Sequence, residues 1–493
     1  MGKYKISDIA TLCKGERCNC NADNYIDKIV INDKIVANNC IFAAIKGERF
    51  DGNAFAEAAV KKGASLILSE AEPIADLPWL KVKNVREALT EIACFIRRKE
   101  LSRVIAVTGS VGKTTVKEMI ASVLSTEMKV LKTEGNQNNE LGLALSVFAH
   151  KGEGTAVLEM GISEIGEMDR LSYVSRPDIA IITGIGSMHG EELKSREITA
   201  REKLKCLNYA SKSCVCIVPY GEALLEKVNN KITVGVSKEA DVYAENVKID
   251  GRGSSFDAVL GNGERINGIF LPLIGMHAVT DALFSVAAAS LMKVSKENIL
   301  KGLSQYKAPP LRQNIIEENG VTVLLDCYNS GPESLMAALE TFMLICRERA
   351  FKRRVLILGG MLELGKNSEN EHIRLGKAAA EYGIFDLITY GDEARNIALG
   401  ALIGGNENVK CFQDEDMLVR ELDGTDFDGC AVLIKGSRAF KMERLLEYVT
   451  KKGDKTDGKI RCYRDRNVVS AYGGAYKSPD PAPDKTEARS TDS

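Results

Sequence analysis

The chain has 493 residues, of which 45% are hydrophobic and 27% charged, and its formal net charge is −2. This length is too great for one hydrophobic core and predicts about three domains. The near-neutral charge gives no sign of a nucleic-acid partner or a membrane surface, and no apolar run is long enough to span a bilayer. Because the N-terminus also lacks the apolar core of a signal peptide, the sequence predicts a cytoplasmic protein whose cysteines are reduced thiols.

Residues 1–98 are expected to form a small α/β domain. Apolar runs at 29–31, 40–45 and 66–68 predict strands, and 53–62 has helical spacing. Four cysteines (Cys13, Cys18, Cys20 and Cys40) could hold zinc, but without a C-x-x-C pair they are more simply small buried residues. The stretch FAAIKGERFDGN at 42–53 places dense charge and glycine beside a strand, which is typical of a solvated turn.

A phosphate-binding loop is predicted where a strand at 103–107 runs into glycines and a helix at 116–124. The loop is Gly109-Ser110-Val111-Gly112-Lys113-Thr114-Thr115. Its glycines let the backbone approach phosphate oxygens, and the helix N-terminus offers unpaired N–H groups. Lys113 is expected to reach the β- and γ-phosphates of ATP, and Thr114 to bind Mg²⁺. The alternative is an ordinary glycine-rich turn.

The short form G-x-x-G-K-T-T resembles the loop of the Mur ligases, the ATP-dependent amide-forming enzymes of peptidoglycan synthesis. The stretch at 42–53 is similar to F-V-A-x-K-G-E-R-F-D-G-H in the branch of this family that adds D-alanyl-D-alanine, with Asn53 where His is usual. The family triplet D-S-R falls on Asn32-Asp33-Lys34. The resemblance implies that residues 1–98 bind a UDP-sugar, with Asn32, Lys46 and Gly47 among the substrate contacts.

Residues 99–308 are expected to form the central ATP-binding domain. Strand-like runs at 155–158, 179–183 and 214–218 alternate with helical spacings, which predicts a parallel sheet with helices on both faces. Ligands bind such sheets at the carboxyl ends of the strands. Glu159 ends one apolar strand and suits Mg²⁺, which prefers oxygen ligands. Without the resemblance, a helix cap or an ion-paired acid is equally consistent with the sequence.

The resemblance assigns roles to further residues of this domain. The loop 132–140 is similar to T-x-G-N-x-N-N-E, which lies beside the metal and the substrate carboxylate, and this implies roles for Asn136, Asn138 and Asn139. His189 matches a second-metal ligand, and Lys203 matches a lysine that is carbamylated in the family and then supports a metal. Asp281 stands where an Asn contacts adenine. Lys113, Glu159, His189 and Lys203 are the implied catalytic residues, and the last three with Thr114 are the implied metal site.

Residues 309–450 are expected to form a third, amine-substrate-binding domain after a Pro309-Pro310 linker. Strands predicted at 321–325, 355–358 and 432–434 lead into segments similar to D-x-Y-N-A-N-P-x-S, L-G-D-M-x-E-L-G and K-G-S-R, with Gly331 for Asn and Gly360 for Asp. The resemblance implies ATP contacts from Arg312 and Asp326. Substrate contacts are implied for Tyr328, Asn329, Lys435 and Ser437. Residues 451–493 are polar and are expected to be disordered.

The implied fold is α/β with three domains, comprising a central P-loop ATPase domain with a mainly parallel sheet and a C-terminal Rossmann-like domain. The implied activity is that of an ATP- and Mg²⁺-dependent ligase, expected to be a monomer, that joins D-alanyl-D-alanine to UDP-MurNAc-tripeptide through an acyl phosphate. Two alternatives remain at this point: a diverged ligase that joins another carboxylate and amine, or a non-catalytic nucleotide-binding homologue. The intact Lys113, Thr114, Glu159 and His189 argue against the second.

Overall fold

The computed structural model describes residues 2–47, 50–74, 76–186, 193, 195–383 and 385–451. Contacts between residues divide the chain into two compact units, one of Met1–Ala308 with Glu363–Asn367 and one of Pro309–Leu362 with the chain from Ser368 onward. The short second segment of the first unit contains the 3₁₀ helix η5 (Gly365–Asn367). Among the described residues, no helix is long and apolar enough to cross a bilayer.

The first unit begins with a small mainly parallel sheet in the order β2-β7-β6-β5-β4, in which only β2 runs antiparallel to its neighbour, while β1 pairs with β3 apart from it. The expected strands appear as β4, β5 and β6. The expected helix at 53–62 starts as a 3₁₀ turn, because the Asp51 side chain accepts from the backbone N–H of Asn53 at 2.9 Å. The elements are β1 (Tyr4–Lys5), α1 (Ile6–Cys13), β2 (Glu16–Cys18), β3 (Tyr25–Ile26), β4 (Lys28–Val30), η1 (Asp33–Ile35), β5 (Cys40–Ala43), η2 (Gly52–Phe55), α2 (Ala56–Lys61), β6 (Ala64–Ser69), β7 (Trp79–Lys81) and α3 (Val85–Glu100).

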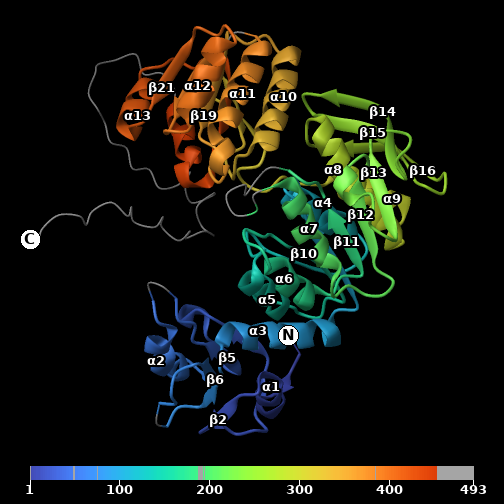
Figure 1. Ribbon diagram of the computed structural model, residues 1–493, viewed down its shortest axis with the longest axis vertical. Coiled ribbons are helices and arrows are strands. Elements are labelled where there is room, and N and C mark those ends of the chain that lie inside the picture. The colour runs from blue at the N-terminus through green and yellow to red at the C-terminus, as the bar shows by residue number, and fades with distance from the viewer. Residues whose placement is uncertain are drawn as a thin grey trace, which may run out of the picture. The chain divides into compact units, whose positions relative to one another are not determined.

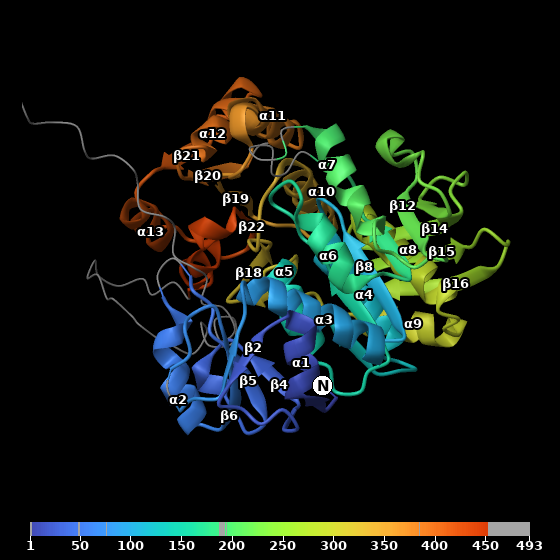
Figure 2. The ribbon, with the colours of Figure 1, turned by 60° about the horizontal axis from the view of Figure 1, so that its bottom comes forward.

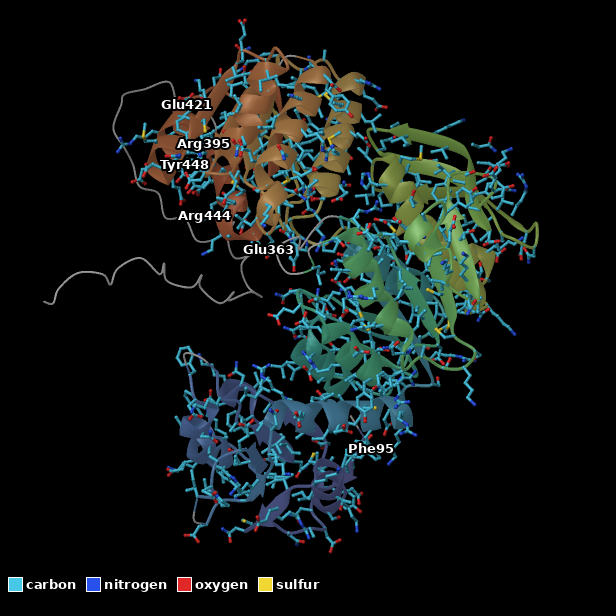
Figure 3. All side chains as sticks on the ribbon, viewed as in Figure 1. Phe95, Glu363, Arg395, Glu421, Arg444 and Tyr448 are labelled. Carbon is cyan, nitrogen blue, oxygen red and sulfur yellow. The ribbon has the colours of Figure 1, made fainter. Side chains whose placement is uncertain are left out.

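Helix α3 joins this sheet to the next part of the unit. It begins at Asn84, whose side chain accepts from the backbone N–H of Glu87 at 3.0 Å. Its buried residues share one core with β5 and β6 on one side and with α5 and α6 on the other (Figures 1 and 2). Phe95 projects from α3 and packs edge-to-face on Tyr4, with ring centroids 5.7 Å apart (Figure 3).

The larger sheet of the first unit has the order β16-β15-β14-β13-β12-β11-β8-β10-β9. It is parallel from β9 to β14 and ends in the antiparallel strands β14, β15 and β16, which the sequence did not indicate (Figure 1). The elements are β8 (Arg103–Thr108), α4 (Lys113–Leu124), β9 (Val130–Lys132), α5 (Glu140–Phe148), β10 (Thr155–Glu159), α6 (Glu167–Ser175), β11 (Ile179–Ile182), α7 (Arg196–Leu204), η3 (Lys205–Leu207), β12 (Val215–Pro219), η4 (Ala223–Leu225), β13 (Lys231–Gly235), β14 (Val242–Asp250), β15 (Gly253–Val259), β16 (Arg265–Leu271), α8 (Met276–Leu291) and α9 (Lys296–Ser304).

Strand β8 lies in the middle of this sheet and is buried on both faces. Val104 and Ala106 pack into the core shared with α3, while Ile105 and Val107 pack into a second core with α4 and α8. A parallel strand that is covered on both faces requires an uninterrupted apolar run, which is why the strand was visible in the sequence.

The second unit is built on a sheet in the order β17-β18-β22-β19-β20-β21, in which only β17 is antiparallel to its neighbour. Helices α10, α11 and α12 lie side by side in this unit (Figure 1). The elements are β17 (Asn314–Glu318), β18 (Val321–Leu325), α10 (Pro332–Glu348), β19 (Arg353–Gly359), α11 (Ser368–Glu381), β20 (Asp386–Tyr390), α12 (Ala394–Ile403), β21 (Val409–Phe412), α13 (Glu415–Asp423), β22 (Cys430–Lys435), η6 (Arg438–Phe440), η7 (Met442–Leu445) and α14 (Leu446–Val449).

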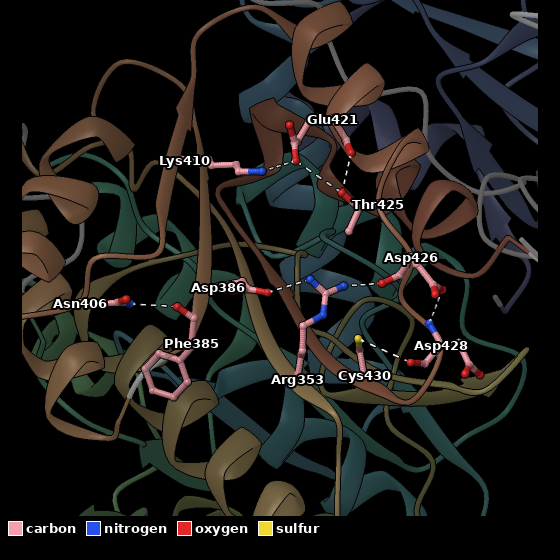
Figure 4. Close-up of polar contacts among 10 residues, drawn as sticks. All are labelled: Arg353, Phe385, Asp386, Asn406, Lys410, Glu421, Thr425, Asp426, Asp428 and Cys430. Carbon is pink, nitrogen blue, oxygen red and sulfur yellow. Dashed lines mark hydrogen bonds and ion pairs between the residues drawn. The ribbon is translucent and has the colours of Figure 1, made fainter. Parts of the chain in front are cut away.

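The amino edge of this second sheet is held by ion pairs (Figure 4). Arg353, the first residue of β19, donates to the Asp386 carboxylate at 3.0 Å and to the backbone carbonyl of Asp426. Lys410 and Glu421 pair at 2.6 Å. The candidate functional residues of this unit lie at the opposite, carboxyl edge, where β18 and β22 end.

Two predictions fall outside the described residues. These are the disorder of the tail beyond Lys451 and the position of His189. The zinc site considered for Cys13, Cys18, Cys20 and Cys40 has no support from the geometry. The described residues contain no group of three or more His, Cys, Asp or Glu side chains that could hold a metal.

Candidate active site

The loop between β8 and α4 has the backbone that its glycines predict. Gly109 has φ 148° and Gly112 has φ 80°, a region that favours glycine. A Cβ atom on Gly109 would lie 2.0 Å from the Thr183 hydroxyl oxygen, so only glycine fits there. Thr183 donates to the backbone carbonyl of Val111. The segment after β11 therefore packs directly against the loop.

Ser110 also ties the loop to the segment after β11. Its backbone N–H donates to the Gly184 carbonyl at 2.9 Å, and its side-chain oxygen accepts from the Gly186 N–H at 2.8 Å. Gly184 thus contributes a backbone contact that any residue could make. The loop is held in shape by its own domain.

Two lysines meet at one carbonyl of the loop. The Nζ atoms of Lys113 and Lys203 lie 2.9 Å and 3.0 Å from the Gly109 carbonyl oxygen. Lys203 is 2% exposed, and burial together with the charge of Lys113 holds the pKa of its ammonium well below the usual range. Thr114 is buried in the first turn of α4. With the helix N-terminus, the Lys113 ammonium makes an electropositive place that suits an anion.

Glu159 ends β10, the strand next to β8, and its carboxylate is buried. Oε1 accepts from the Asn138 side-chain amide at 2.9 Å. Oε2 has no hydrogen-bond donor within the described part of the chain, and its nearest cation is Lys117, at 3.7 Å. Gly161 makes room for this arrangement, because a Cβ atom there would lie 2.8 Å from the Asn138 amide nitrogen.

Lys117 is a residue of this site that the sequence did not single out. Its side chain is fully buried, and its Nζ lies 2.7 Å from the Thr133 carbonyl oxygen and 2.9 Å from a Glu118 carboxylate oxygen. Burial raises the pKa of Glu118, but Lys117 and Lys132 outweigh it and lower that pKa overall. A Lys-Glu pair in an otherwise apolar helix, one turn after Lys113, was the available signal.

The other asparagines of the 132–140 loop have different surroundings. Asn139 caps α5, its side chain accepting from the Gly142 N–H at 2.9 Å. Asn136 is exposed, and its carbonyl accepts from the Asn138 N–H at 2.7 Å. The loop therefore presents Asn138 to Glu159 and leaves Asn136 to solvent.

Asp281 lies on α8 against the phosphate-binding loop. A Cβ atom on Gly112 would lie 2.8 Å from its Oδ1 atom. The carboxylate is thus next to the N-terminus of α4. An adenine contact from this position stays a prediction.

The predicted residues of the N-terminal sheet lie at its surface. Asn32 is exposed and accepts from the Lys34 N–H at 2.9 Å. Lys46 and Gly47 are exposed as well. Asn53, which replaces the family histidine, donates to Asp51 at 2.7 Å and accepts from the Ser69 hydroxyl at 2.5 Å.

In the second unit, four predicted residues gather where β18 and β22 end. Lys435 is buried, and its Nζ lies 2.8 Å from an Asp326 carboxylate oxygen and 3.0 Å from the Asn329 carbonyl oxygen. Ser437 accepts from the Leu362 N–H at 3.0 Å. The structure therefore brings Asp326, Asn329, Lys435 and Ser437 together at the carboxyl edge of the sheet.

Arg312 and Tyr328 form a cation–π pair in the same unit. The guanidinium carbon lies 4.1 Å from the ring centroid. Such stacking is worth roughly 0.5–2 kcal/mol and fixes the direction of the arginine. Its predicted contact with ATP phosphates stays a prediction.

Three parts of the chain match domains of one family. Residues 26–97 match the catalytic domain of the Mur ligase family, 107–289 the Mur ligase middle domain, and 311–438 the Mur ligase glutamate ligase domain.

Two curated relatives illustrate the similarity. The UDP-N-acetylmuramoyl-tripeptide–D-alanyl-D-alanine ligase of Bacillus subtilis (strain 168) is 34% identical over 457 residues, covering 91% of this chain and 98% of that protein. The enzyme of that name from Escherichia coli (strain K12) is 29% identical over 461 residues, with coverage of 91% and 98%.

Solved structures give the same result. MurF from Acinetobacter baumannii superposes with a TM-score of 0.82 at 28% identity, covering 91% of this chain and 99% of that one. MurF ligase from Thermotoga maritima, in complex with ADP, gives a TM-score of 0.75 at 26% identity, with coverage of 86% and 97%. The α/β fold class predicted from the sequence, with three domains and mainly parallel sheets, is confirmed by these matches.

Proposed function

This chain belongs to the Mur ligase family, and from that premise we propose that it adds D-alanyl-D-alanine to UDP-MurNAc-tripeptide in peptidoglycan synthesis, with ATP converted to ADP and phosphate. The observation that carries the proposal is the meeting of Lys113 and Lys203 at the Gly109 carbonyl. The Lys113 ammonium on the glycine loop suits a phosphate chain, and Lys203, with its lowered pKa, adds an amine beside it. The full-length similarity to relatives with this named activity supports the choice of substrates.

ATP is assigned to the loop between β8 and α4. Residues 109–115 would wrap the phosphates with backbone N–H groups, and Lys113 would leave the Gly109 and Ser110 carbonyls to contact them. The related structure that contains ADP supports nucleotide binding in this fold. Asp281, Arg312 and Asp326 are the further proposed nucleotide contacts.

Mg²⁺ is assigned to the carboxylate of Glu159, with Thr114, His189 and a modified Lys203 as further ligands. The residues fit a cation, because a buried carboxylate oxygen of Glu159 lacks a hydrogen-bond donor within the described residues. Carboxylate and hydroxyl oxygens are the ligands that Mg²⁺ prefers. When bound, the ion would offset the negative charge that builds up between the substrate carboxylate and the γ-phosphate.

Carbamylation of Lys203 is also part of the proposal. The reaction joins a neutral amine to CO₂ and releases a proton, so it needs the uncharged lysine. Burial and the neighbouring Lys113 lower the pKa of Lys203 and favour that form. The product would carry a negative charge next to Lys113, and the Lys113 ammonium would stabilise that charge.

The reaction follows from these parts. An oxygen of the substrate carboxylate attacks the γ-phosphorus, the bond to the β-phosphate oxygen breaks, and ADP leaves. The amine nitrogen then attacks the acyl carbon, loses its proton and expels phosphate. We assign the peptide carboxylate to Asn136, Asn138 and Asn139, and the UDP-sugar to Asn32, Lys46 and Gly47. The amine substrate is assigned to Tyr328, Asn329, Lys435 and Ser437.

The test is phosphate release from Mg²⁺-ATP with UDP-MurNAc-tripeptide, with and without D-alanyl-D-alanine, combined with mass spectrometry of the product. Release that needs both substrates and yields the pentapeptide supports the proposal. Lys113→Met should abolish it, because the phosphates lose their lysine. A wild-type protein that hydrolyses ATP only with another carboxylate and amine would instead indicate a diverged ligase. Replacements such as Asn53 and Gly360 make that the second candidate.

A further inference from the structure

The carboxylate of Glu393 lies at the carboxyl edge of the second sheet. Glu393 follows β20 and directly precedes α12, and β20 runs parallel to and beside β19. Its side chain is partly buried and does not cap α12. Within the described residues it has no hydrogen bond or ion pair. Because the side chain is only partly buried, a ligand from solvent can reach the carboxylate.

This carboxylate occupies the place of a missing side chain. A Cβ atom added to Gly360 would lie 3.2 Å from Cβ and 3.3 Å from Oε2 of Glu393, with the Phe440 ring also 3.3 Å away. Gly360 stands where the similar family motif carries Asp. Glu393 therefore brings a carboxylate, from the neighbouring strand, to the position from which that aspartate would project.

The position adjoins the proposed substrate residues. The Gly360 carbonyl accepts from the Ser437 N–H at 3.1 Å, and the Ser437 hydroxyl accepts from the Leu362 N–H at 3.0 Å. The carboxylate of Asp326, nearby on the same edge, is already paired with Lys435 at 2.8 Å. An incoming cation at this edge would therefore find Asp326 neutralised and Glu393 without an ion-pair partner.

The histidine close to Glu393 does not neutralise it. His372 accepts from the Met361 N–H through Nε2 at 2.9 Å, and Nδ1 lies 2.6 Å from the Ser368 carbonyl oxygen. Burial lowers its pKa, while Glu393 and Glu371 oppose that change only in part. A neutral ring with both nitrogens in use gives Glu393 no cationic partner.

We propose that Glu393 binds the ammonium group of the amine substrate and supplies a carboxylate where position 360 has none. This inference rests on the proposed function, because it takes D-alanyl-D-alanine as the amine. An α-amino group has a pKa of about 8, so most of the dipeptide arrives as the ammonium form at neutral pH. A partly desolvated carboxylate is a strong partner for it.

The test compares KM values for each substrate in the full-length enzyme. Glu393→Gln should raise KM for D-alanyl-D-alanine roughly 10- to 100-fold, the loss expected for a hydrogen bond to a charged group. The KM values for ATP and UDP-MurNAc-tripeptide should stay unchanged. Glu407→Gln, an exposed carboxylate of the same unit, is the matched control.

A swap of the carboxylate gives a second readout that a purely structural role would not produce. Gly360→Asp combined with Glu393→Ala should restore KM to within about threefold of wild type. Gly360→Asp alone should impair binding, because its Cβ would crowd Glu393 and add a second negative charge. Rescue by the swap, with dipeptide binding lost in Glu393→Ala alone, supports the assignment.

Wild-type turnover together with an unchanged dipeptide KM in Glu393→Gln overturns the assignment of Glu393 and leaves the proposed function intact. Equal increases in all three KM values also overturn it, because they indicate a general disturbance. A wild-type enzyme that makes no pentapeptide overturns the proposed function, and with it this inference.

Discussion

Lys117→Met tests whether the buried lysine stabilises the carboxylates around it. Methionine has a similar length but no charge. The change removes the donor from the Thr133 carbonyl, at 2.7 Å, and the cation beside Glu159, at 3.7 Å. Glu118 keeps a second cation, since Lys132 lies 2.6 Å from its other oxygen. The main result is a carboxylate of Glu159 that is buried without a neighbouring charge.

The expected loss follows from that uncompensated charge. Removing one member of a buried ion pair costs about 3–5 kcal/mol in the free energy of unfolding. At roughly 2–4 °C for each 1 kcal/mol, the melting temperature of the first unit should fall by about 6–20 °C. Lys132→Met removes only the outer pair, whose lysine is 32% exposed, and should cost less than about 1 kcal/mol.

Denaturation can be followed through the chain's single tryptophan, Trp79, which is buried in the first unit. Urea unfolding of wild type, Lys117→Met, Glu159→Gln and the double variant gives a thermodynamic cycle. If the unpaired Glu159 charge causes the loss, the double variant should recover about 1–3 kcal/mol relative to the sum of the single changes. A loss below 1 kcal/mol in Lys117→Met, or strictly additive changes, would refute this explanation.

Three further predictions concern other residues. Gly161→Ala should cost about 1–3 kcal/mol in stability, measured by thermal unfolding, because its Cβ would lie 2.8 Å from the Asn138 amide nitrogen and must displace it. The folded-state pKa of His372 lies below its unfolded value of about 6.5, so the stability that neutral His372 contributes is complete above pH 6.5 and is lost as pH falls through the folded pKa. The melting temperature of wild type should therefore fall more steeply below pH 6.5 than that of His372→Gln. Glutamine at this position keeps an acceptor for the Met361 N–H. Lys203 should give a carbamate signal in ¹³C NMR with labelled bicarbonate, and Lys203→Met should remove it.

Each of these has an outcome that contradicts it. An equal cost of Gly161→Ala in an Asn138→Ala background would show that the amide is not what the methyl group displaces. Parallel melting curves for wild type and His372→Gln between pH 7.5 and 5.5 would exclude His372 as the source of the acid sensitivity. A carbamate signal of the same size in Lys203→Met would place the modification on another amine.

The strand, glycine loop and helix at 103–124 could be predicted because their conformation depends on a local pattern. The apolar run of β8 and the glycines at 109 and 112 are adjacent in sequence, and the fold leaves them adjacent in space. Parallel strands then bring their carboxyl ends to one edge, which is why Asp326, Asn329 and Lys435 lie together.

The remaining features depend on contacts that sequence spacing does not reveal. Lys117 has the helical period of an ordinary surface lysine, and only the packed strands β9 and β10 make its position buried. Glu393 and Gly360 are 33 positions apart in the sequence, and they meet only because β19 and β20 pair. The antiparallel strands β14 to β16 alternate in burial and lacked the continuous apolar run typical of the parallel strands.

Because α3 joins the two sheets of the first unit in one core, a ligand bound at one sheet also changes the stability of the other. Leu66 and Leu68 of β6 belong to the same core as Val104 and Ala106 of the strand that leads into the phosphate-binding loop, and β6 pairs with the strand that carries Trp79. A ligand that binds only the folded state stabilises the whole cooperative unit, by about 2.7 kcal/mol at 100 times its Kd. A nucleotide bound at the loop would therefore raise the free energy of unfolding of the N-terminal sheet as well. The fluorescence of Trp79 would then report nucleotide binding, although Trp79 does not belong to the nucleotide site.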